Sequence, residues 1–316
     1  MRRYKASRVL LTIALGITLA ACSAAQQVAD TTFDTRVAHP ALTTRHPKVL
    51  FDEAHHNFHT AGGRYKPFAD LITHDGCLVM SGHAPFTASA LAGHDLLIIS
   101  NALGAENMTD SLASRSAFTE PECDAVSDWV RDGGALLLIA DHAPMGSAAR
   151  TLASRIGVDM RNGVTADSAA SVHAGGNTTL LVFSRANGLL RDHAITNGRD
   201  SSERVSTIRT FTGQSLKGPE GSVAFLSLAP TALDLIAPSL QAAMNMSSDQ
   251  AISAAGRAQG IAFEFGKGRV VVMGEAAMLS AQLSGPARVP MGMNVPGLDN
   301  RQLALNTVRW LTRWLN

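Results

Sequence analysis

The chain has 316 residues, a formal net charge of +1 at pH 7 and 46% hydrophobic residues. Because the charges nearly balance and no basic tract occurs, a nucleic-acid partner is not expected. Roughly 290 mature residues, rich in small and apolar types, suit one large α/β domain in which helices pack closely on a sheet.

The N-terminus has the pattern of a bacterial export signal. A basic start precedes an apolar stretch, Val9 to Ala21, that is short for a membrane span. Its end, Leu19-Ala20-Ala21-Cys22, resembles the lipobox of bacterial lipoproteins. The resemblance implies that residues 1–21 are a signal peptide and that Cys22 is lipidated. Cleavage by the ordinary signal peptidase is the alternative.

The same resemblance predicts the cellular location. Ser23 follows the cysteine where an aspartate would favour the inner membrane. We therefore expect an outer-membrane lipoprotein that faces the periplasm and meets the membrane only through its N-terminal lipid. Residues 22–46 lack periodicity, which indicates a flexible tether, and residues 47–316 form the single predicted domain.

Three apolar runs that indicate buried strands each end in an acidic residue. KVLFD ends at Asp52, ALLLIAD at Asp141 and RVVVMGE at Glu275. In parallel sheets the carboxyl ends of the strands open into the ligand crevice. We therefore expect the three acids to converge on one site.

Other elements alternate between strand and helix along the chain. A capping box at Thr119 to Glu122 opens a helix that ends before Gly133-Gly134, and Gly266-Lys267-Gly268 turns a hairpin. The alternation predicts a doubly wound, mostly parallel sheet, with an irregular β-containing insertion from about residue 157. Further predicted elements are a helix over Tyr65 to His74, strands over Cys77 to Ser81 and Asp95 to Ser100, and a terminal helix from Asp299.

Four motifs together resemble one protein superfamily. They are FDEAHHNFH, IADHAP, GKGRVVVMGEAAM and DNRQLALNTVRWL, within residues 47–315. They resemble a bacterial lipoprotein branch, a domain of unknown function, of the class I glutamine amidotransferase-like superfamily. The resemblance implies a flavodoxin-like core but no particular reaction.

The chain departs from the glutaminase pattern of that superfamily. Glutamine amidotransferases place a cysteine at the tight turn after this strand, with a histidine and an acid farther along. Here the turn is Asp141-His142-Ala143-Pro144, and no histidine follows His193. A Cys-dependent glutaminase is therefore not expected. Cys77 and Cys123 could form a disulfide or remain buried thiols.

Histidines near two of the strand ends suggest a metal site. His55 and His59 are four residues apart, and His142 follows Asp141. With the nearby acids they could bind a divalent metal such as zinc or manganese. The alternative is that Asp52 and Asp141 cap helices while the histidines hydrogen-bond to loop backbone.

Polar residues beside the acids are candidate ligand contacts. They are Asp52, Asn57, Asn101 and Asn300, although Asn101 could form an Asx turn and Asn300 could cap a helix. Glu275 could merely complement a helix dipole. Arg64, after Gly62-Gly63, could clamp an anion, but a solvated loop arginine is favoured.

These observations predict an envelope hydrolase, with or without a metal, that acts on a small or envelope-derived polar substrate. Asp141 or Glu275 would be the general base, with His142 as a further catalytic candidate, and histidines of the DEAHHNFH turn would bind metal or stabilise the developing oxyanion. The alternative is a non-catalytic module that uses the same crevice to bind a small molecule, an envelope polymer or a protein.

Overall fold

The computed structural model describes residues 27–169 and 171–316, and its fold is α/β. A nine-stranded, largely parallel central sheet is accompanied by three antiparallel sheets of three strands each. This arrangement confirms the predicted fold class, including the β-containing insertion. Cys22 and the signal peptide lie outside the described residues.

The elements follow the predicted order. The helices are α1 (Lys66–His74), α2 (Ala88–Leu91), α3 (Glu120–Arg131), α4 (Met145–Arg155), α5 (Ala194–Asn197), α6 (Leu240–Met244) and α7 (Asn300–Leu311). The strands are β1 (Val28–Ala29), β2 (Lys48–Asp52), β3 (Leu78–Gly82), β4 (Leu96–Ser100), β5 (Ala135–Ile139), β6 (Asp159–Met160), β7 (Gly163–Ala166), β8 (His173–Ala174), β9 (Asn177–Ser184), β10 (Thr207–Arg209), β11 (Leu216–Lys217), β12 (Val223–Ser227), β13 (Leu233–Ile236), β14 (Ile252–Ser253), β15 (Ala258–Phe265), β16 (Gly268–Met273), β17 (Ala281–Ser284) and β18 (Val289–Gly292).

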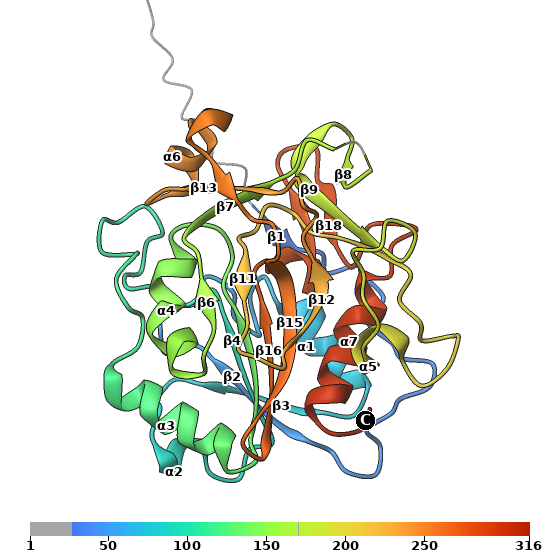
Figure 1. Cartoon of the computed structure of the whole chain (residues 1–316). Coiled ribbons are helices and arrows are strands. Elements are labelled where there is room, and N and C mark those ends of the chain that lie inside the picture. The colour runs from blue at the N-terminus through green and yellow to red at the C-terminus, as the bar shows by residue number, and fades with distance from the viewer. Residues whose placement is uncertain (1–26, 170) are drawn as a thin grey trace, which may run out of the picture.

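The central sheet has the strand order β3-β2-β4-β5-β16-β15-β11-β6, with β12 also paired to β15. The five strands from β3 to β16 are parallel, and β15 runs against β16 through the predicted hairpin. The carboxyl ends of the parallel strands therefore share one edge. The small sheets gather at that end of the molecule in Figure 1.

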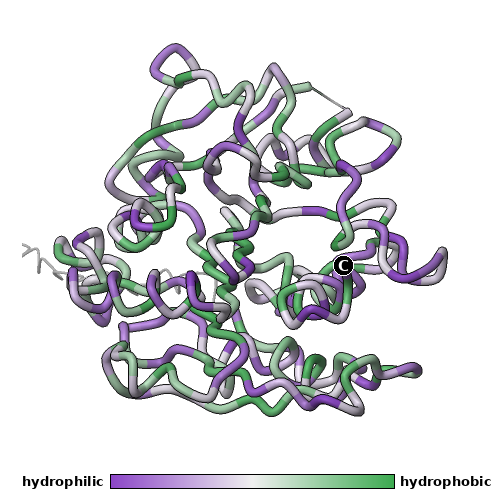
Figure 2. Tube along the Cα trace, turned by 60° about the horizontal axis from the view of Figure 1, so that its bottom comes forward, coloured by the Kyte–Doolittle hydropathy of each residue, from purple (hydrophilic) through white to green (hydrophobic). Residues whose placement is uncertain are grey.

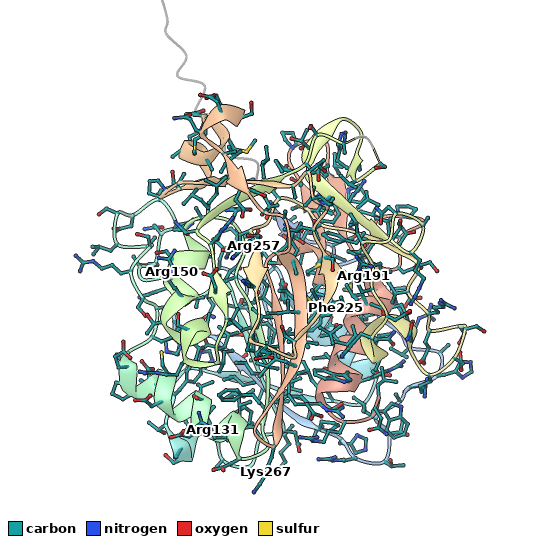
Figure 3. The ribbon with its side chains drawn as sticks, in the orientation of Figure 1. Arg131, Arg150, Arg191, Phe225, Arg257 and Lys267 are labelled. Atoms are coloured by element: carbon teal, nitrogen blue, oxygen red, sulfur yellow. The ribbon has the colours of Figure 1, made fainter. Side chains whose placement is uncertain are left out.

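Helices cover both faces of the central sheet. In Figure 1, α1 and α7 lie on one side of it and α3 and α4 on the other. Successive residues of β2 accordingly enter two different cores: Val49 and Phe51 pack on one side and Leu50 on the other. Figure 2 shows hydrophobic segments running through the middle of the molecule. Phe225 of β12, labelled in Figure 3, lies fully buried in this interior.

Two segments differ from the sequence-based expectation. The predicted tether extends too far, because β1 pairs with β17 and Ala41 and Leu42 are buried, so residues 27–46 pack on the domain. Isolated contacts of this kind leave no periodicity in the sequence. The segment after Glu275 makes only a 3-10 turn, Ala277–Leu279, before β17 begins.

Two further properties concern the cysteines and membrane-spanning helices. Cys77 and Cys123 are buried and free, so they do not form the disulfide that the sequence left open. Across residues 27–169 and 171–316, no helix is long and apolar enough to cross a membrane.

Candidate functional site

Two adjoining cavities lie beside the ends of the central strands. The first, of about 550 Å³, is called the Asp141 cavity, and the second, of about 400 Å³, is called the Arg209 cavity. Both volumes fall in the range of small-molecule sites. The Asp141 cavity is lined by Gln27, Phe58, His59, Arg64, Asn101, Met108, Asp141, His142, Met145, Phe211, Leu240, Ala277 and Met291.

Asp141 is held at the end of β5 by its neighbours. Its backbone amide donates to Oδ1 of Asn101 over 3.0 Å, and its own Oδ1 accepts the amide of His142 over 2.7 Å. Nε2 of Gln214 donates to the carbonyls of Ala140 and Asp141. Asn101 adopts a left-handed conformation, φ 50°, which asparagine tolerates better than most residues. The carboxylate is therefore fixed in position on the cavity wall.

The pKa of Asp141 is raised by its burial, although the positive charge of His142 and several hydrogen bonds oppose the shift. A carboxyl group with a raised pKa that lines a cavity is a typical general acid or base. Only 7% of the residue is exposed, so its contact with solvent runs through the cavity.

Glu275 lies behind this wall and lines neither cavity. It is fully buried, and its two oxygens accept the amides of Ala277 and Met278 at 2.7 and 2.8 Å. Burial and the nearby charge of Asp141 raise the pKa of Glu275 well above its usual value. Two buried carboxyl groups that repel each other favour a state in which one is protonated. Burial and repulsion by Asp141 favour the protonated form of Glu275, and Asp141 is the member of the pair that lines a cavity.

His142 lines both cavities and has a defined tautomer. Its Nδ1 lies 2.9 Å from the carbonyl oxygen of Ala143. Because a carbonyl only accepts hydrogen bonds, Nδ1 carries a hydrogen, and in the neutral form of the ring the lone pair lies on Nε2. The ring can therefore accept a proton or a hydrogen bond at Nε2.

His59 is a second imidazole on the wall of the Asp141 cavity. Burial, with the charges of Arg64 and His142, lowers its pKa to about 3, so the ring is neutral. Its Nδ1 lies 3.3 Å from the hydroxyl of Ser100, and its buried Nε2 has no hydrogen-bond partner among the described residues. The ring stacks on Tyr65 with centroids 4.7 Å apart.

Arg64 places a cation on the same wall. Its Nε and Nη1 donate to the carbonyls of Gln27 and Phe58, and its guanidinium lies 4.0 Å from the centroid of the Phe58 ring. Burial lowers the pKa of Arg64. The structure thus differs from the favoured expectation of a solvated arginine, and the anion clamp stays a prediction.

A second cluster, the His55 network, is separate from the cavities. Nδ1 of His55 lies 2.8 Å from Oδ1 of Asp52, and its Nε2 lies 2.9 Å from Oε1 of Glu122. Asp52 also accepts from Ala54 and from Nδ2 of Asn57. Burial acts to lower the pKa of His55, but the two carboxylates raise it, so the ring is held as a cation.

The predicted convergence of all three acids is therefore wrong. Asp52, His55 and Asn57 line neither cavity, and their polar groups bind one another and Glu122. Glu122 comes from α3, where it also closes the predicted capping box with Thr119. The cavities are lined instead by Arg64, which the sequence singled out only as the less favoured anion clamp, and by Phe211 and Arg209, which it did not single out.

The predicted metal set of His55, His59 and His142 is also corrected. Both ring nitrogens of His55 are engaged by carboxylates, which leaves no lone pair for a metal. In the described part of the chain, no group of three or more His, Cys, Asp or Glu side chains could hold a metal ion. His142 and His59 remain beside the cavity as hydrogen-bonding groups.

Asn300, predicted to contact ligand, instead holds two backbone segments together. Its Oδ1 accepts the amide of Arg209, and its Nδ2 donates to the carbonyls of Arg209 and Met278. Its amide group is therefore fully engaged. Asn300 thereby fixes the end of β10, where Arg209 lies.

Comparison with known proteins places the fold. No protein-family model matches the chain, and no curated protein sequence does. Among solved structures, the mmIFT52 N-terminal domain aligns with a TM-score of 0.57 and 14% identity, covering 84% of this chain and 97% of that one. A ThuA-like protein from Bacteroides uniformis aligns at 0.43 and 12% identity, covering 87% and 93%. A GMP synthase protein from Thermoplasma acidophilum aligns at 0.42 and 12% identity, covering 85% and 96%.

Of these three alignments, the one with the mmIFT52 N-terminal domain has a TM-score above 0.5 and shows a likeness in fold. Identities of this size show a shared fold and do not transfer an activity.

Proposed function

We propose that the protein is a hydrolase that acts on a small or envelope-derived polar substrate in the Asp141 cavity. The observation that carries the proposal is the carboxyl group of Asp141, which lines a cavity and has a raised pKa. His142, His59 and Arg64 surround it with groups that can bind or stabilise negative charge. Hydrolysis needs this combination of a proton acceptor and a cationic or hydrogen-bonding wall.

The proposed reaction uses water as the nucleophile. Ionised Asp141 accepts a proton from water while the water oxygen bonds to the electrophilic atom of the substrate. Arg64 stabilises the negative charge that develops on the substrate, and the proton then passes to the leaving group as its bond breaks. Glu275 keeps its proton throughout and acts as a positioning residue for Asp141.

A cysteine nucleophile has no place in the proposal. No cysteine is among the described residues that line the Asp141 cavity, and burial raises the pKa of both Cys77 and Cys123, the latter to about 11. Buried thiols with raised pKa values are poor nucleophiles. This supports the proposal that the chain belongs to a branch of the amidotransferase-like superfamily that lacks the glutaminase cysteine.

The test is a panel of chromogenic esters, amides, phosphoesters and glycosides, assayed with the wild type, Asp141→Asn and a surface control, Arg150→Gln. At least one class should be turned over, and Asp141→Asn should lower that rate by about 10²-fold or more. Arg150→Gln should keep it. Turnover that survives Asp141→Asn, or no turnover of any class, would reject the hydrolase.

A non-catalytic binding module is the second candidate. It is favoured by the absence of Ser, Thr and Cys from the described lining of the Asp141 cavity and by its apolar residues, such as Phe58, Met108 and Met145. In that case a ligand would bind to the wild type and to Asp141→Asn without being cleaved.

We also propose that Cys22 is lipidated and anchors the protein in the outer membrane, facing the periplasm. The sequence Leu19-Ala20-Ala21-Cys22 supports the anchor, and Ser23 supports the outer membrane. Cys22→Ser should release the protein from the membrane fraction or leave an uncleaved precursor. Ser23→Asp should keep the lipid but move the protein to the inner membrane. Unchanged partitioning and mature mass in Cys22→Ser would exclude the anchor.

A further inference from the structure

Arg209 is a partly buried cation without a counter-ion. No ion pair or hydrogen bond joins its guanidinium to another described residue, and its Nε is buried without a partner. Its guanidinium lies over the Phe211 ring, 4.9 Å from the centroid. A buried charge that is left unpaired costs stability, which makes this position unusual for a structural arginine.

Other buried arginines of the same chain show the structural arrangement. Arg309 binds Asp75 with two nitrogens and Glu203 with a third, each at 2.7 Å. Arg257, labelled in Figure 3, binds Asp159 over 2.6 Å and also Ser215. For these two guanidiniums the fold supplies carboxylates, and for the buried Arg269 it supplies the carbonyls of Trp310 and Leu315. At Arg209 it supplies a cavity instead.

The position of Arg209 is fixed before any ligand arrives. Its backbone amide and carbonyl are both bound by the side chain of Asn300, and β10 pairs with β9. Thr179 and Thr212 line the same cavity, and their hydroxyls, 2.9 Å apart, bond to each other, while that of Thr179 also bonds to Asn177. A guanidinium on an anchored backbone, with no hydrogen bond of its own to a described residue, suits a carboxylate or phosphate group.

The Arg209 cavity is continuous with the site of the proposed reaction. The two cavities share five lining residues, namely Gln27, His142, Phe211, Leu240 and Met291. Three of these are apolar, and Met244, Val289 and Pro290 extend the apolar wall on the Arg209 side. A ligand could therefore reach from Asp141 to Arg209 along a largely apolar path.

We propose that Arg209 is an anion-binding subsite, and that the ligand of this protein is an organic anion with an apolar portion. The anionic group binds at Arg209, the apolar portion lies along Phe211, Leu240 and Met291, and the bond to be hydrolysed lies at Asp141. The inference deepens the proposed function and rests on it for the position of the reacting bond.

The experiment measures binding of three probes of equal chain length by calorimetry: octanoate, octyl phosphate and the neutral 1-octanol. The wild type should bind at least one anion about tenfold or more tightly than octanol, and the better anion identifies the charged group. Arg209→Gln should lose that preference while binding octanol as before. Arg209→Lys should retain part of it, and Arg150→Gln, on the outer part of α4 in Figure 3, should retain all of it.

Equal affinity for the anions and octanol in the wild type, or an unchanged anion preference in Arg209→Gln, would overturn the subsite. Asp141→Asn should bind the anion as the wild type does, because the charge at Arg209 is untouched. Anion binding that depends on Arg209 in a protein without hydrolytic activity would reject the hydrolase and support the subsite. Hydrolysis that does not depend on Arg209 would support the hydrolase and reject the subsite.

Discussion

The His55 network and the Asp141–Glu275 pair are built from the same kinds of side chain at the edge of one sheet, but they differ in how completely those side chains are bonded. In the network, both ring nitrogens of His55 contact carboxylates, and Glu122 accepts from three further groups. In the pair, two acids are buried together with raised pKa values and one of them lines a cavity. A satisfied cluster stabilises the fold, whereas a cluster that retains unfavourable charge has capacity left for a ligand.

The largest expected effect follows from removing the cation of the network. His55→Ala should lower the free energy of unfolding by about 3 to 5 kcal/mol, because it leaves Asp52 and Glu122 buried without their counter-ion. Urea unfolding measures this loss. His56→Asn is the control, since His56 is exposed and its φ of 48° suits asparagine. A loss below about 1 kcal/mol would show that the network does not stabilise the fold.

The His55 network should also lose part of its contribution to stability in acid. Burial acts to raise the pKa of Glu122, but hydrogen bonds from Thr119 and His55 lower it to about 2. Its contribution is therefore present above its unfolded value of 4.5 and is lost as the pH falls toward 2. Wild type should lose stability over this range more steeply than His55→Ala. Parallel pH profiles for the two proteins would contradict this.

The Asp141–Glu275 pair should give the opposite pH dependence, with stability falling as the pH rises. The folded pKa of Glu275 is raised, so the folded state binds more protons than the unfolded state and stability falls as the pH rises above the unfolded value of 4.5. Glu275→Gln cannot ionise, so its stability relative to wild type should increase as the pH rises above the unfolded value of 4.5. Unfolding curves across this range test the sign. A constant difference would mean that Glu275 only caps the turn at Ala277.

The last prediction is that thiol alkylation has no effect on ligand binding. Alkylation of the folded protein should leave ligand binding unchanged, because Cys77 and Cys123 are buried and have raised pKa values. Mass spectrometry of the folded and denatured protein provides the measurement and its control. Loss of binding in proportion to modification of either thiol would show that the site has been misplaced.

Much of the fold could be predicted from the sequence because its strands are continuous apolar runs. KVLFD and ALLLI form β2 and β5 as expected, and Asp141, His142 and Asn101 were found because they follow such runs. The separation of Asp52 from Asp141 could not be predicted, since the partner of His55 is Glu122, 67 residues away on a helix. A capping box already explained Glu122.

The Arg209 subsite gave no sequence signal for a different reason. Arg209 is a single arginine in a short strand of the irregular region, where alternating polar residues normally face solvent. Only the structure shows that β10 runs beside a cavity and that Asn300, 91 residues later, holds its backbone. Residues brought together over such distances leave no local pattern.

The pairing of β1 with β17 leaves only a short segment between Cys22 and the folded domain. Gln27, immediately before β1, lines both cavities and is five residues after Cys22. Five extended residues span at most about 18 Å, so a lipid on Cys22 would hold the cavity mouth close to the bilayer surface. If the chain were unattached to the domain up to residue 46, the domain could lie farther from the bilayer and change its orientation relative to it. Fluorescence quenching by lipid-borne quenchers, with and without a Gly/Ser insertion after residue 26, would measure this. Tethered in this way, the protein would meet its ligands by a search in two dimensions, favouring molecules that share its membrane.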